Sequence, residues 1–482
     1  MSNQKPKKNL KPIKKIIKFG GSCLREPSSL RNIVSILKQE KERVALVVSA
    51  VSGITNLLID AYHLSLSQDR NYQGIMAQIK NRHLLLASEL LSLSHFGQYQ
   101  AKSQEILKQL ERTLKGLSLT GESTPSLKAR VLSAGERLSA FLLAAVLEEA
   151  GFKCRVFETD RVGLVANQPS EEAEVVLEKF DFLFRKTAEE INQDDYIPVF
   201  TGFFGITEEG KLALFGRNGS DYSAAVIARG FQATVLTTYK DVPGFLTADP
   251  EFIPEARPVN RLSRKEAAEL CYFGARILHP KIWQPLEGLE TTVEIKEFSR
   301  PESLGTIISN SSEKAARIIK SLSVNQNIAL VKVEGPGVGF KPGLIGKIGS
   351  RLAEKDLNIL TVLTSQTCIN LLMSPAAAEL ARTRLVELKE PAFRKITLEK
   401  NLALIACVGE GLRETPGVAS HLLSILARKG INLELFSSGG SEVALYLVVK
   451  KQDAGRALHL LHEKYLGPGE AREEQVGLTI TG

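Results

Sequence analysis

The sequence predicts an α/β fold in which helices sandwich a mainly parallel sheet, followed by two smaller units of ferredoxin-like βαββαβ form. Two observations predict this fold. Short apolar runs alternate with helical patterns up to about residue 310, and the chain beyond residue 320 repeats itself. Because 482 residues exceed what one hydrophobic core organises, several domains are also expected from the length.

The strands of the sheet are predicted from compact apolar runs, and the helices from Leu-rich stretches with helical spacing. Gly20-Gly21 ends the first run as a turn, and Gly151 ends a helix predicted over residues 136–150. Strands that alternate with helices are typical of a parallel sheet. The predicted strands lie at residues 13–19, 43–48, 196–200 and 235–238.

The C-terminal repeat has a constant offset of 74 residues, so that Asn327 aligns with Asn401 and Pro342-Gly343 with Pro416-Gly417. A glycine turn before a helix suits a small polar ligand, although a duplicated unit can also be purely structural. The predicted domains are a flexible basic tail (1–14), a large α/β domain (15–310), a linker (311–320) and two repeat units (321–395 and 396–482).

The charge distribution argues against nucleic acid as a partner. Seven of the net +8 charges come from lysines within residues 1–18, so the remaining chain is close to neutral. No apolar run predicts a membrane span or a secretory signal. The five cysteines are scattered and form no Cys-x-x-Cys pair, which argues against a disulfide framework or a zinc site and favours the cytoplasm.

Lys18-Phe19-Gly20-Gly21-Ser22 follows the first predicted strand and combines a cation with two residues that lack a Cβ atom. The glycines let backbone N–H groups approach an anion, and the lysine can neutralise a phosphoryl group. Taken alone, this loop is explained equally well as a tight turn.

Gly216-Arg217-Asn218-Gly219-Ser220-Asp221 precedes an apolar helix, with Ser220 or Asp221 as the expected N-cap. An ordinary helix cap is one interpretation. Arg217 and Asp221 flank the turn closely enough for one to bind a substrate carboxylate while the other meets an ammonium group or a metal-bound phosphate.

Two further segments carry carboxylates. Asp241 and Asp249 follow a strand, where nucleotides bind in parallel sheets, although a plain surface loop is the alternative. Glu136 is predicted in the first turn of its helix, where it either compensates the helix dipole or receives a substrate ammonium.

Taken in this order, the segments resemble the aspartate kinase family over about residues 15–480. The kinase part of enzymes fused to homoserine dehydrogenase is particularly similar, and the repeated units look like paired ACT domains. Because the chain stops at Gly482, no dehydrogenase domain is expected. The resemblance rests on K-F-G-G-S (18–22), V-V-S-A-V-S-G-I-T-N (47–56), G-E-R (135–137), G-R-N-G-S-D-Y (216–222), D-V-P-G-F-L-T-A-D-P (241–250) and Y-F-G-A-R-I-L-H-P (272–280).

The resemblance implies transfer of the ATP γ-phosphate to the β-carboxylate of L-aspartate, which gives 4-phospho-L-aspartate, the first step toward lysine, threonine and methionine. No general base is needed, because the attacking carboxylate is already ionised at neutral pH. Positioning and charge neutralisation by Lys18, Mg²⁺ and backbone amides then carry the chemistry. The implied catalytic residues are Lys18 and Asp221, and the implied substrate-binding residues are Ser49, Thr55, Glu136, Arg217, Gly219 and Ser220.

The nucleotide side departs from the family pattern at Lys240, Leu246, Glu251 and Arg276, which replace a Thr, an aromatic residue, an Arg and a Lys. Glu251 is therefore not expected to bind phosphate directly, and no protein metal site is predicted. The implied ATP-binding residues are Lys18, Gly20, Gly21, Ser22, Lys240, Asp241, Leu246, Arg276 and Ile277.

The resemblance also implies an effector amino acid, lysine or threonine, bound near Asn358 and Gln366 of the first repeat. Ser438 stands where fusion-type relatives carry a glutamine in the second repeat. ACT pairing normally needs a second subunit, so a homodimer or homotetramer is expected.

Two other functions remain compatible with the sequence. One is a kinase of the same fold that acts on glutamate, N-acetylglutamate, carbamate or a nucleotide. The other is a catalytically inactive amino-acid sensor that uses only the ACT pair.

Overall fold

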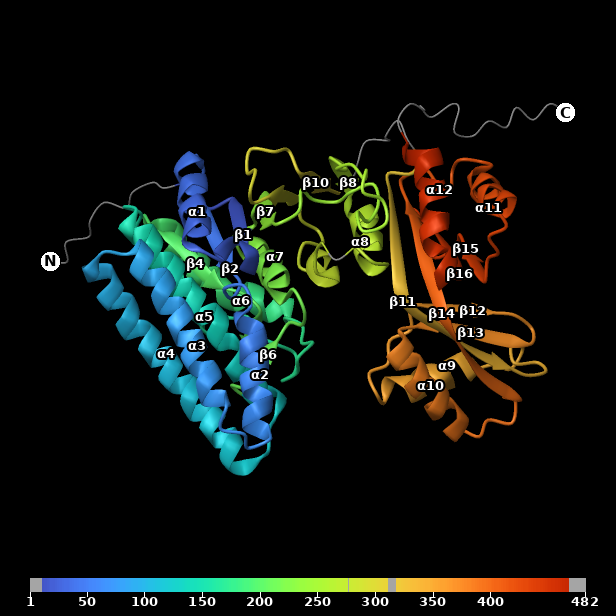
Figure 1. Cartoon of the computed structure of the whole chain (residues 1–482), viewed down its shortest axis with the longest axis horizontal. Helices are drawn as coiled ribbons and strands as arrows, with labels where there is room; N and C mark the ends of the chain where they lie inside the picture. The colour runs from blue at the N-terminus through green and yellow to red at the C-terminus, as the bar shows by residue number, and fades with distance from the viewer. Residues whose placement is uncertain (1–10, 276, 311–317, 468–482) are drawn as a thin grey trace. The chain divides into compact units, whose positions relative to one another are not determined.

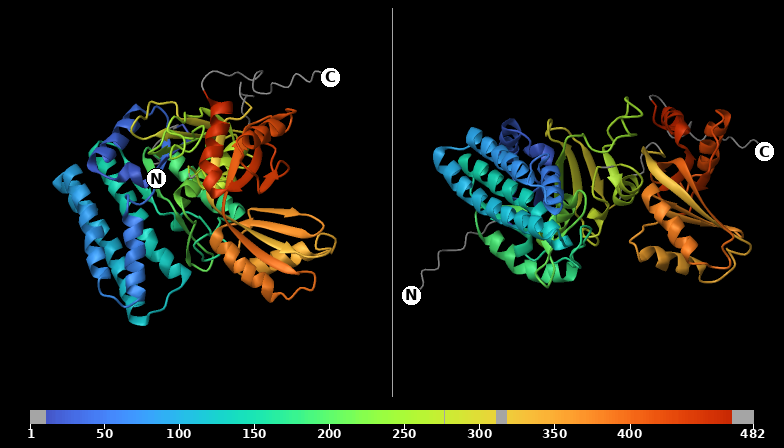
Figure 2. Two further views of the ribbon diagram at one scale, coloured as in Figure 1. Left: turned by 45° about the vertical axis from the view of Figure 1, so that its right-hand side comes forward. Right: turned by 60° about the horizontal axis from the view of Figure 1, so that its bottom comes forward.

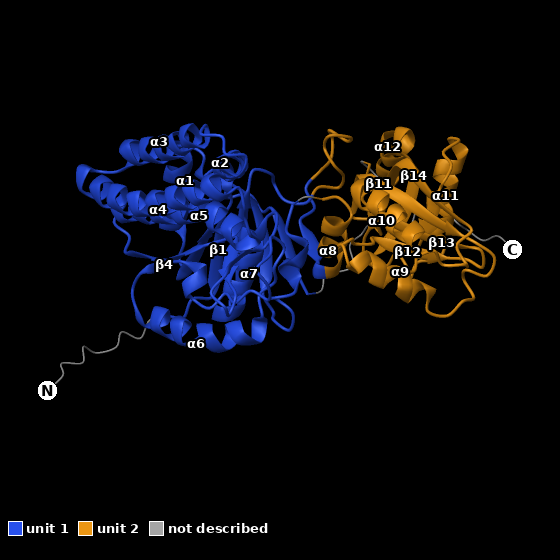
Figure 3. Ribbon diagram, turned by 90° about the horizontal axis from the view of Figure 1, so that it is seen from below, with its two compact units in different colours: residues 1–245, 258–264, 276–311 blue, residues 246–257, 265–275, 312–482 orange. Residues whose placement is uncertain are grey.

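The computed structural model describes residues 11–275, 277–310 and 318–467. Two compact units are present: unit 1 (residues 1–245, 258–264 and 276–311) and unit 2 (residues 246–257, 265–275 and 312–482), shown in Figure 3. Most of the predicted tail, residues 1–10, lies outside the described residues. Within the described ranges, no helix is long and apolar enough to cross a membrane.

Unit 1 is built on an eight-stranded sheet in the order β3-β4-β2-β1-β7-β9-β10-β8 (Figure 1). Every neighbouring pair from β3 to β9 is parallel, and only the β9–β10 pair is antiparallel. The predicted, mainly parallel sheet is therefore confirmed. Its strands are β1 (Lys15–Phe19), β2 (Val44–Val48), β3 (Cys154–Phe157), β4 (Ile197–Thr201), β7 (Val235–Lys240), β8 (Arg261–Ser263), β9 (Thr292–Glu297) and β10 (Thr306–Ser309).

Helices cover both faces of this sheet. Successive side chains of a strand point to opposite faces, and the central strands β1 and β2 are mainly buried and apolar, so both faces are apolar and need a cover. Phe19 packs in a core with residues of α1 and α5, whereas Phe200 contacts Phe184 of α6 and Phe231 of α7. Both views in Figure 2 show α3, α4 and α5, blue to teal, as neighbouring long helices. The helices are α1 (Pro27–Gln39), α2 (Ile54–Leu66), α3 (Tyr72–Leu90), α4 (Leu93–Thr120), α5 (Pro125–Glu149), α6 (Leu177–Gln193) and α7 (Gly219–Phe231).

Short elements complete unit 1. Among the described residues of this unit, a two-stranded hairpin and three single-turn helices lie between the main elements. They are β5 (Phe204–Ile206), β6 (Leu212–Leu214), η1 (Gly21–Leu24), η2 (Thr159–Arg161) and η3 (Pro280–Trp283).

Two helix starts differ from the prediction. The helix predicted from Glu136 begins at Pro125, after a Thr124 side chain that accepts a hydrogen bond from the Leu127 N–H, so Glu136 lies in mid-helix. Gly135 does not mark a helix start. A Cβ atom there would lie 2.8 Å from Cβ of Ala50, so this glycine permits close packing. For α7 the N-cap is Asn218, in the left-handed conformation with φ 60°, and not Ser220 or Asp221.

Unit 2 carries a six-stranded antiparallel sheet in the order β12-β13-β11-β14-β16-β15. Its helices include α8 (Arg264–Tyr272), whose residues from Lys265 on belong to this unit. The other elements are β11 (Ser321–Glu334), α9 (Leu344–Ala353), β12 (Thr361–Thr364), β13 (Cys368–Met373), α10 (Pro375–Glu387), β14 (Lys395–Val408), α11 (Val418–Arg428), β15 (Leu435–Ser437), β16 (Ala444–Lys450), η4 (Lys451–Asp453) and α12 (Ala454–Leu466).

The 74-residue repeat is visible in these elements. Strands β11 and β14 correspond residue for residue at that offset, and Gly343 and Gly417 cap the equivalent helices α9 and α11. The two long strands pair along their length and serve two cores, since Val331 packs in one core while Leu322 and Val324 pack with β14, β16 and α12 in the other. The long strand of each repeat thus contributes side chains to the hydrophobic core of the other repeat.

Candidate active site

Two lysines and one aspartate form a buried cluster at the carboxyl ends of β1 and β7. Nζ of Lys18 lies 2.7 Å from Oδ1 of Asp221, and Nζ of Lys240 lies 2.8 Å from Oδ2 of the same carboxylate. Lys18 and Lys240 come from adjacent parallel strands, and Asp221 comes from the first turn of α7. The sheet register and the α7 helix therefore bring together three residues that are far apart in the sequence.

The electrostatics of this cluster favour a charged Asp221. Burial opposes the charge on this fully buried carboxylate, but the ammonium groups of Lys18 and Lys240 outweigh burial and lower its pKa to about 2. For Lys18, burial lowers the pKa from its ordinary value, while the Asp221 charge opposes that shift. Two cations share one anion, so the cluster carries an excess positive charge.

The Gly20-Gly21 loop lies directly beside this charge. A Cβ atom on Gly20 would lie 3.5 Å from Nζ of Lys18, and one on Gly21 would lie 2.8 Å from the carbonyl oxygen of Ala50. Gly21 also accepts a hydrogen bond from the Ser52 N–H at 3.2 Å. The glycine at position 21 is thus required by close backbone packing, while the buried Gly20 places its backbone next to the ammonium group of Lys18.

Glu136 projects from the middle of α5 toward the loop that follows β2. Its Oε1 accepts a hydrogen bond from the Ala50 N–H at 3.2 Å, and its buried Oε2 has no hydrogen-bond partner among the described residues. Burial raises the pKa of Glu136 to about 8, against the opposing charge of Lys18. This carboxyl is suited to receive a cation, because an ammonium group would both satisfy Oε2 and stabilise the ionised form.

The remaining substrate-side residues lie on the loops around this cluster. Arg217 is exposed, and its guanidinium forms no ion pair within the part of the chain that the structure describes. Ser49 follows β2 and donates its N–H to the carbonyl of Phe19, while Thr55 is half-buried in the first turn of α2. Gly219 and Ser220 are buried at the start of α7, beside Asp221.

The predicted nucleotide residues are only partly brought together. Ser22 lies in η1 after the glycine pair, and Asp241 is exposed directly after Lys240. Leu246 belongs to unit 2, where its carbonyl accepts a hydrogen bond from Ser321, and Ile277 is half-buried in unit 1. Arg276 lies outside the described residues. The roles of these residues stay predictions.

Sequence reasoning missed two residues beside the cluster. Thr238 is fully buried opposite Lys18 in the β1–β7 register, and its hydroxyl has no hydrogen-bond partner among the described residues. His279 is buried with its ring 5.9 Å from that of Tyr222, and burial lowers its pKa while the Asp221 charge opposes the shift. The histidine is part of the string at 272–280, but nothing in that string indicated its position.

Unit 2 contains a hollow of about 300 Å³ at the glycine turn before α9. The N–H of Gly339 in this turn donates to the carbonyl of Gln366 at 3.1 Å, although the exposed Gln366 and Asn358 side chains are not among the lining residues. The effector roles of Asn358 and Gln366 therefore stay predictions. The lining residues are Val338 to Gly346 together with Thr364 and Ile369.

The described residues contain no group of three or more His, Cys, Asp and Glu side chains that could hold a metal ion. The cluster in unit 1 instead combines cations, glycine backbone and single carboxylates at the carboxyl ends of parallel strands. Doubly wound α/β proteins bind nucleotides and other anionic ligands at this edge of the sheet.

The chain belongs to the amino acid kinase family, whose model matches residues 14–297. A second model, described as an ACT domain, matches residues 405–465 in the second repeat. Together with curated relatives named aspartokinases, these matches confirm the predicted family resemblance.

The curated relatives include single-function and fused enzymes. The chain is 29% identical over 470 residues to bifunctional aspartokinase/homoserine dehydrogenase 1, chloroplastic, of Arabidopsis thaliana, which covers 93% of this chain and 50% of that relative. It is 27% identical over 474 residues to aspartokinase 1, chloroplastic, of the same plant, with 96% and 82% covered. The chain thus spans about half the length of the fused plant relatives it matches.

Solved structures confirm the fold. E. coli aspartokinase III, in complex with aspartate and ADP, superposes with a TM-score of 0.81 at 24% identity and covers 93% of this chain and 99% of its own. Clostridium acetobutylicum aspartate kinase gives a TM-score of 0.74 at 21% identity, with 94% and 100% covered. The sandwiched parallel sheet and the C-terminal ACT-like region are therefore shared with these kinases.

Proposed function

We propose that this chain is an aspartate kinase, which transfers the γ-phosphate of ATP to the β-carboxylate of L-aspartate and gives 4-phospho-L-aspartate and ADP. The observation that carries the proposal is the cluster of Lys18, Lys240 and Asp221, where excess positive charge is buried beside the glycine loop at Gly20. Relatives named aspartokinases support the choice of substrate. One solved neighbour was also crystallised with aspartate and ADP.

The reaction requires no proton transfer. A β-carboxylate oxygen of aspartate forms a bond to the γ-phosphorus, the bond from that phosphorus to the β,γ-bridging oxygen breaks, and ADP leaves with the electron pair. Because the carboxylate is already ionised near neutral pH, the chain has only to position the reactants and neutralise charge.

Lys18 supplies the charge neutralisation. Its ammonium is held by Asp221 at 2.7 Å at the carboxyl end of β1, so it is in place before the substrates bind. Such preorganisation costs no rearrangement during the reaction. Lys240 shares the same carboxylate, which leaves a net positive charge to face the transferring phosphoryl group.

Glu136 and Arg217 hold the amino-acid substrate. The unpartnered Oε2 of Glu136 accepts the substrate ammonium, and the free guanidinium fork of Arg217 binds the α-carboxylate. The Ser49 and Thr55 hydroxyl groups donate to the substrate from the neighbouring loops. Aspartate is thereby fixed at its two α-substituents, and its β-carboxylate is left free to attack.

Mg²⁺ fits this site as an ion carried by the nucleotide. In kinases it takes one or two protein carboxylates beside the substrate phosphates. Both oxygens of Asp221 already lie against Nζ of Lys18 or Lys240, so the exposed carboxylate of Asp241 would take this role. When bound, the ion neutralises phosphate charge. ATP itself is expected at Gly20, Gly21, Ser22, Lys240 and Asp241.

We further propose feedback control by lysine or threonine, bound at the hollow before α9, in a cytoplasmic homodimer or homotetramer. In this arrangement the α/β domain (15–310) is catalytic, and the two repeats (321–395 and 396–482) sense the amino acid. Titrating lysine, threonine and methionine separately against activity tests this proposal. A lack of response to all three would leave the repeats with a structural role.

The test of the main proposal is ADP release by the full chain with aspartate, glutamate, N-acetylglutamate or carbamate as acceptor. Trapping the acyl phosphate as a hydroxamate identifies the product. Turnover with aspartate and hydroxamate formation would support the proposal. Turnover only with another acceptor, or none under any condition, would reject it.

A further inference from the structure

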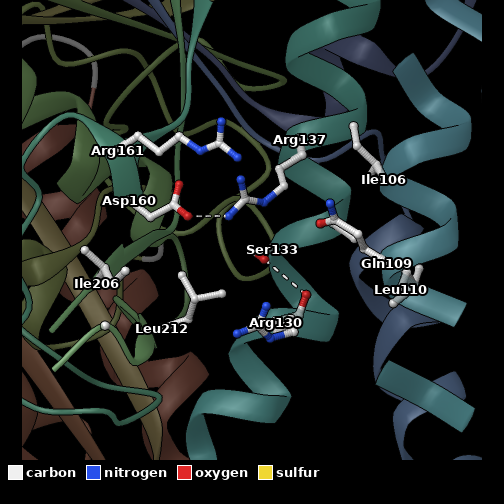
Figure 4. A pocket seen from close by; sticks show the side chains of 12 residues that line it. Ile106, Gln109, Leu110, Arg130, Ser133, Arg137, Asp160, Arg161, Ile206 and Leu212 are labelled. Carbon is white, nitrogen blue, oxygen red and sulfur yellow. Dashed lines mark hydrogen bonds and ion pairs between the residues drawn. The ribbon is translucent and has the colours of Figure 1, made fainter. Parts of the chain in front are cut away.

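Unit 1 contains a polar hollow of about 210 Å³, away from the lysine–aspartate cluster and bounded by α4, α5, η2 and the β5–β6 hairpin. Figure 4 shows three arginine side chains that reach into it, two from α5 and one from η2. Arg137 is part of the G-E-R string at 135–137, but Arg130 and Arg161 lie outside the family motifs, and the proposed reaction uses none of the three. The lining residues are Ile106, Gln109, Leu110, Arg130, Ser133, Ala134, Arg137, Asp160, Arg161, Ile206, Gly210 and Leu212.

Arg137 lines this hollow, and its side chain is held in place by contacts with three neighbours. It donates to Asp160 at 2.7 Å, forms a close ion pair with Glu158, and lies 4.7 Å from the ring centroid of Phe204. Its side chain is 13% exposed. The two carboxylates and the ring hold this guanidinium in one orientation.

Arg130 and Arg161 are not held in this way. Arg161 is 72% exposed and has one long ion pair, 3.5 Å to Glu158. The exposed guanidinium of Arg130 forms no ion pair within the ranges that the structure describes. Both therefore retain free N–H donors at the rim of the hollow. Three guanidinium groups face two carboxylates, so the hollow has a net positive charge.

We infer that this hollow is a binding site for a small tetrahedral oxyanion, a phosphate or a phosphate monoester. Guanidinium forks bind phosphate oxygens in pairs. Arg130 and Arg161 lie in different elements, so they approach a ligand from different directions. A tetrahedral anion offers oxygens in both directions, whereas a planar carboxylate offers one edge.

A neighbouring hollow of about 610 Å³ leaves room for an organic substituent on such an anion. Gln109 and Arg130 line both hollows, and Leu117 and Leu127 give the second one an apolar wall. A phosphate monoester with an apolar group would therefore fill both, while inorganic phosphate would fill only the first.

The oxyanion site differs from the proposed active site, although the two share helix α5. Successive helical residues point about 100° apart. Glu136 accordingly contacts Ala50, whereas Arg137 contacts Asp160. Binding of the oxyanion therefore does not depend on the proposed kinase activity.

The experiment is arginine modification of the full chain by phenylglyoxal, with each site read by peptide mass spectrometry. Orthophosphate should slow modification of Arg130 and Arg161, by roughly elevenfold at ten times its Kd. Chloride at matched ionic strength should not. Exposed Arg185 of α6, which has no ion pair in the described part of the chain, is the internal control. Equal protection of Arg185, or no protection of the two rim arginines, would overturn the inference.

The same assay with phenyl phosphate distinguishes the two sources of the anion. Stronger protection by phenyl phosphate than by orthophosphate supports a monoester, and equal or weaker protection supports inorganic phosphate.

Equilibrium dialysis with labelled orthophosphate provides a second measurement. R130A and R161A should each weaken binding about tenfold or more, because each removes charge-assisted hydrogen bonds, while R185A should not. Unchanged binding in both rim variants would contradict the site.

Discussion

Unit 1 and unit 2 each bury a lysine against a carboxylate, but the charge balance differs. In unit 1, Lys18 and Lys240 share Asp221, which leaves an excess cation beside the Gly20-Gly21 loop. In unit 2, Lys320 of the chain before β11 pairs with Glu266 of α8 at 2.9 Å. Glu266 also accepts the Glu410 N–H at 2.8 Å, so its charge and its oxygens are satisfied within the unit.

This difference in charge balance distinguishes a ligand-binding site from an ion pair that only stabilises the fold. A buried ion pair that is balanced and hydrogen-bonded needs no ligand, and its removal leaves an uncompensated charge in the core. A buried cluster with a surplus charge is completed by a ligand of the opposite sign. The following predictions test the comparison, from the largest expected effect to the smallest.

Lys320→Ala should lower the free energy of unfolding of unit 2 by about 3–5 kcal/mol, because Glu266 then remains as a buried charge without its cation. Chemical denaturation followed by circular dichroism measures this. Lys265→Ala, which breaks an exposed ion pair with Glu442 in the same unit, is the control and should stay close to wild type. Equal effects of the two variants would remove the distinction.

Lys18→Ala should lower kcat by about 10²–10³, because the preorganised cation for the transferring phosphoryl group is lost. Steady-state ADP release at saturating substrates measures the change. Exposed Lys38 of α1 provides the control variant Lys38→Ala, which should turn over like wild type. If Lys18→Ala retained wild-type kcat, the surplus charge would have no catalytic role.

Glu136→Gln should change how stability depends on pH. The folded pKa of Glu136, about 8, lies above its ordinary value of 4.5, so between these pH values only the folded state holds the proton. The contribution of Glu136 to stability is therefore present at low pH and decreases as pH rises, by about 1.4 kcal/mol per pH unit.

Unfolding free energies at several pH values should show this slope in wild type relative to Glu136→Gln. Glu111→Gln, an exposed change in α4, should keep it, and a slope retained in Glu136→Gln would contradict the buried-acid description.

Arg217→Lys should raise the KM for aspartate about tenfold with little change in stability, because a lysine cannot reproduce the bidentate fork of an exposed arginine. Initial rates over a range of aspartate concentrations measure it. Arg185→Lys tests whether an arginine-to-lysine change elsewhere on unit 1 matters. An aspartate KM that stays at the wild-type value would remove Arg217 from the substrate site.

The parts of the fold that the sequence predicted are those with a local or repeated signal. The apolar runs that became β1, β2, β4 and β7 needed no knowledge of their neighbours, because a strand buried on both faces is apolar throughout. The 74-residue repeat predicted the correspondence of β11 and β14 for a similar reason. It did not show that these strands serve both cores, which depends on their antiparallel pairing.

The site was less predictable, because its contacts depend on tertiary packing. The shared carboxylate of Asp221 requires the parallel register of β1 and β7, which brings Lys18 and Lys240 together. Glu136 was predicted in the first turn of its helix, but it lies in mid-helix, and Gly135 before it allows Ala50 to pack closely against α5. Thr238 and the arginine-lined hollow have no sequence signal at all, since only the packing of distant elements creates them.

Hydroxamate formation by the full chain, with ATP and aspartate or glutamate, tests the central claim most directly. That claim is that the surplus buried charge at Lys18 serves phosphoryl transfer to aspartate. The account predicts a product with aspartate, little with glutamate, and a loss of about 10²–10³ in rate for Lys18→Ala. Product formation with glutamate alone, or a Lys18→Ala variant as active as wild type, would contradict it.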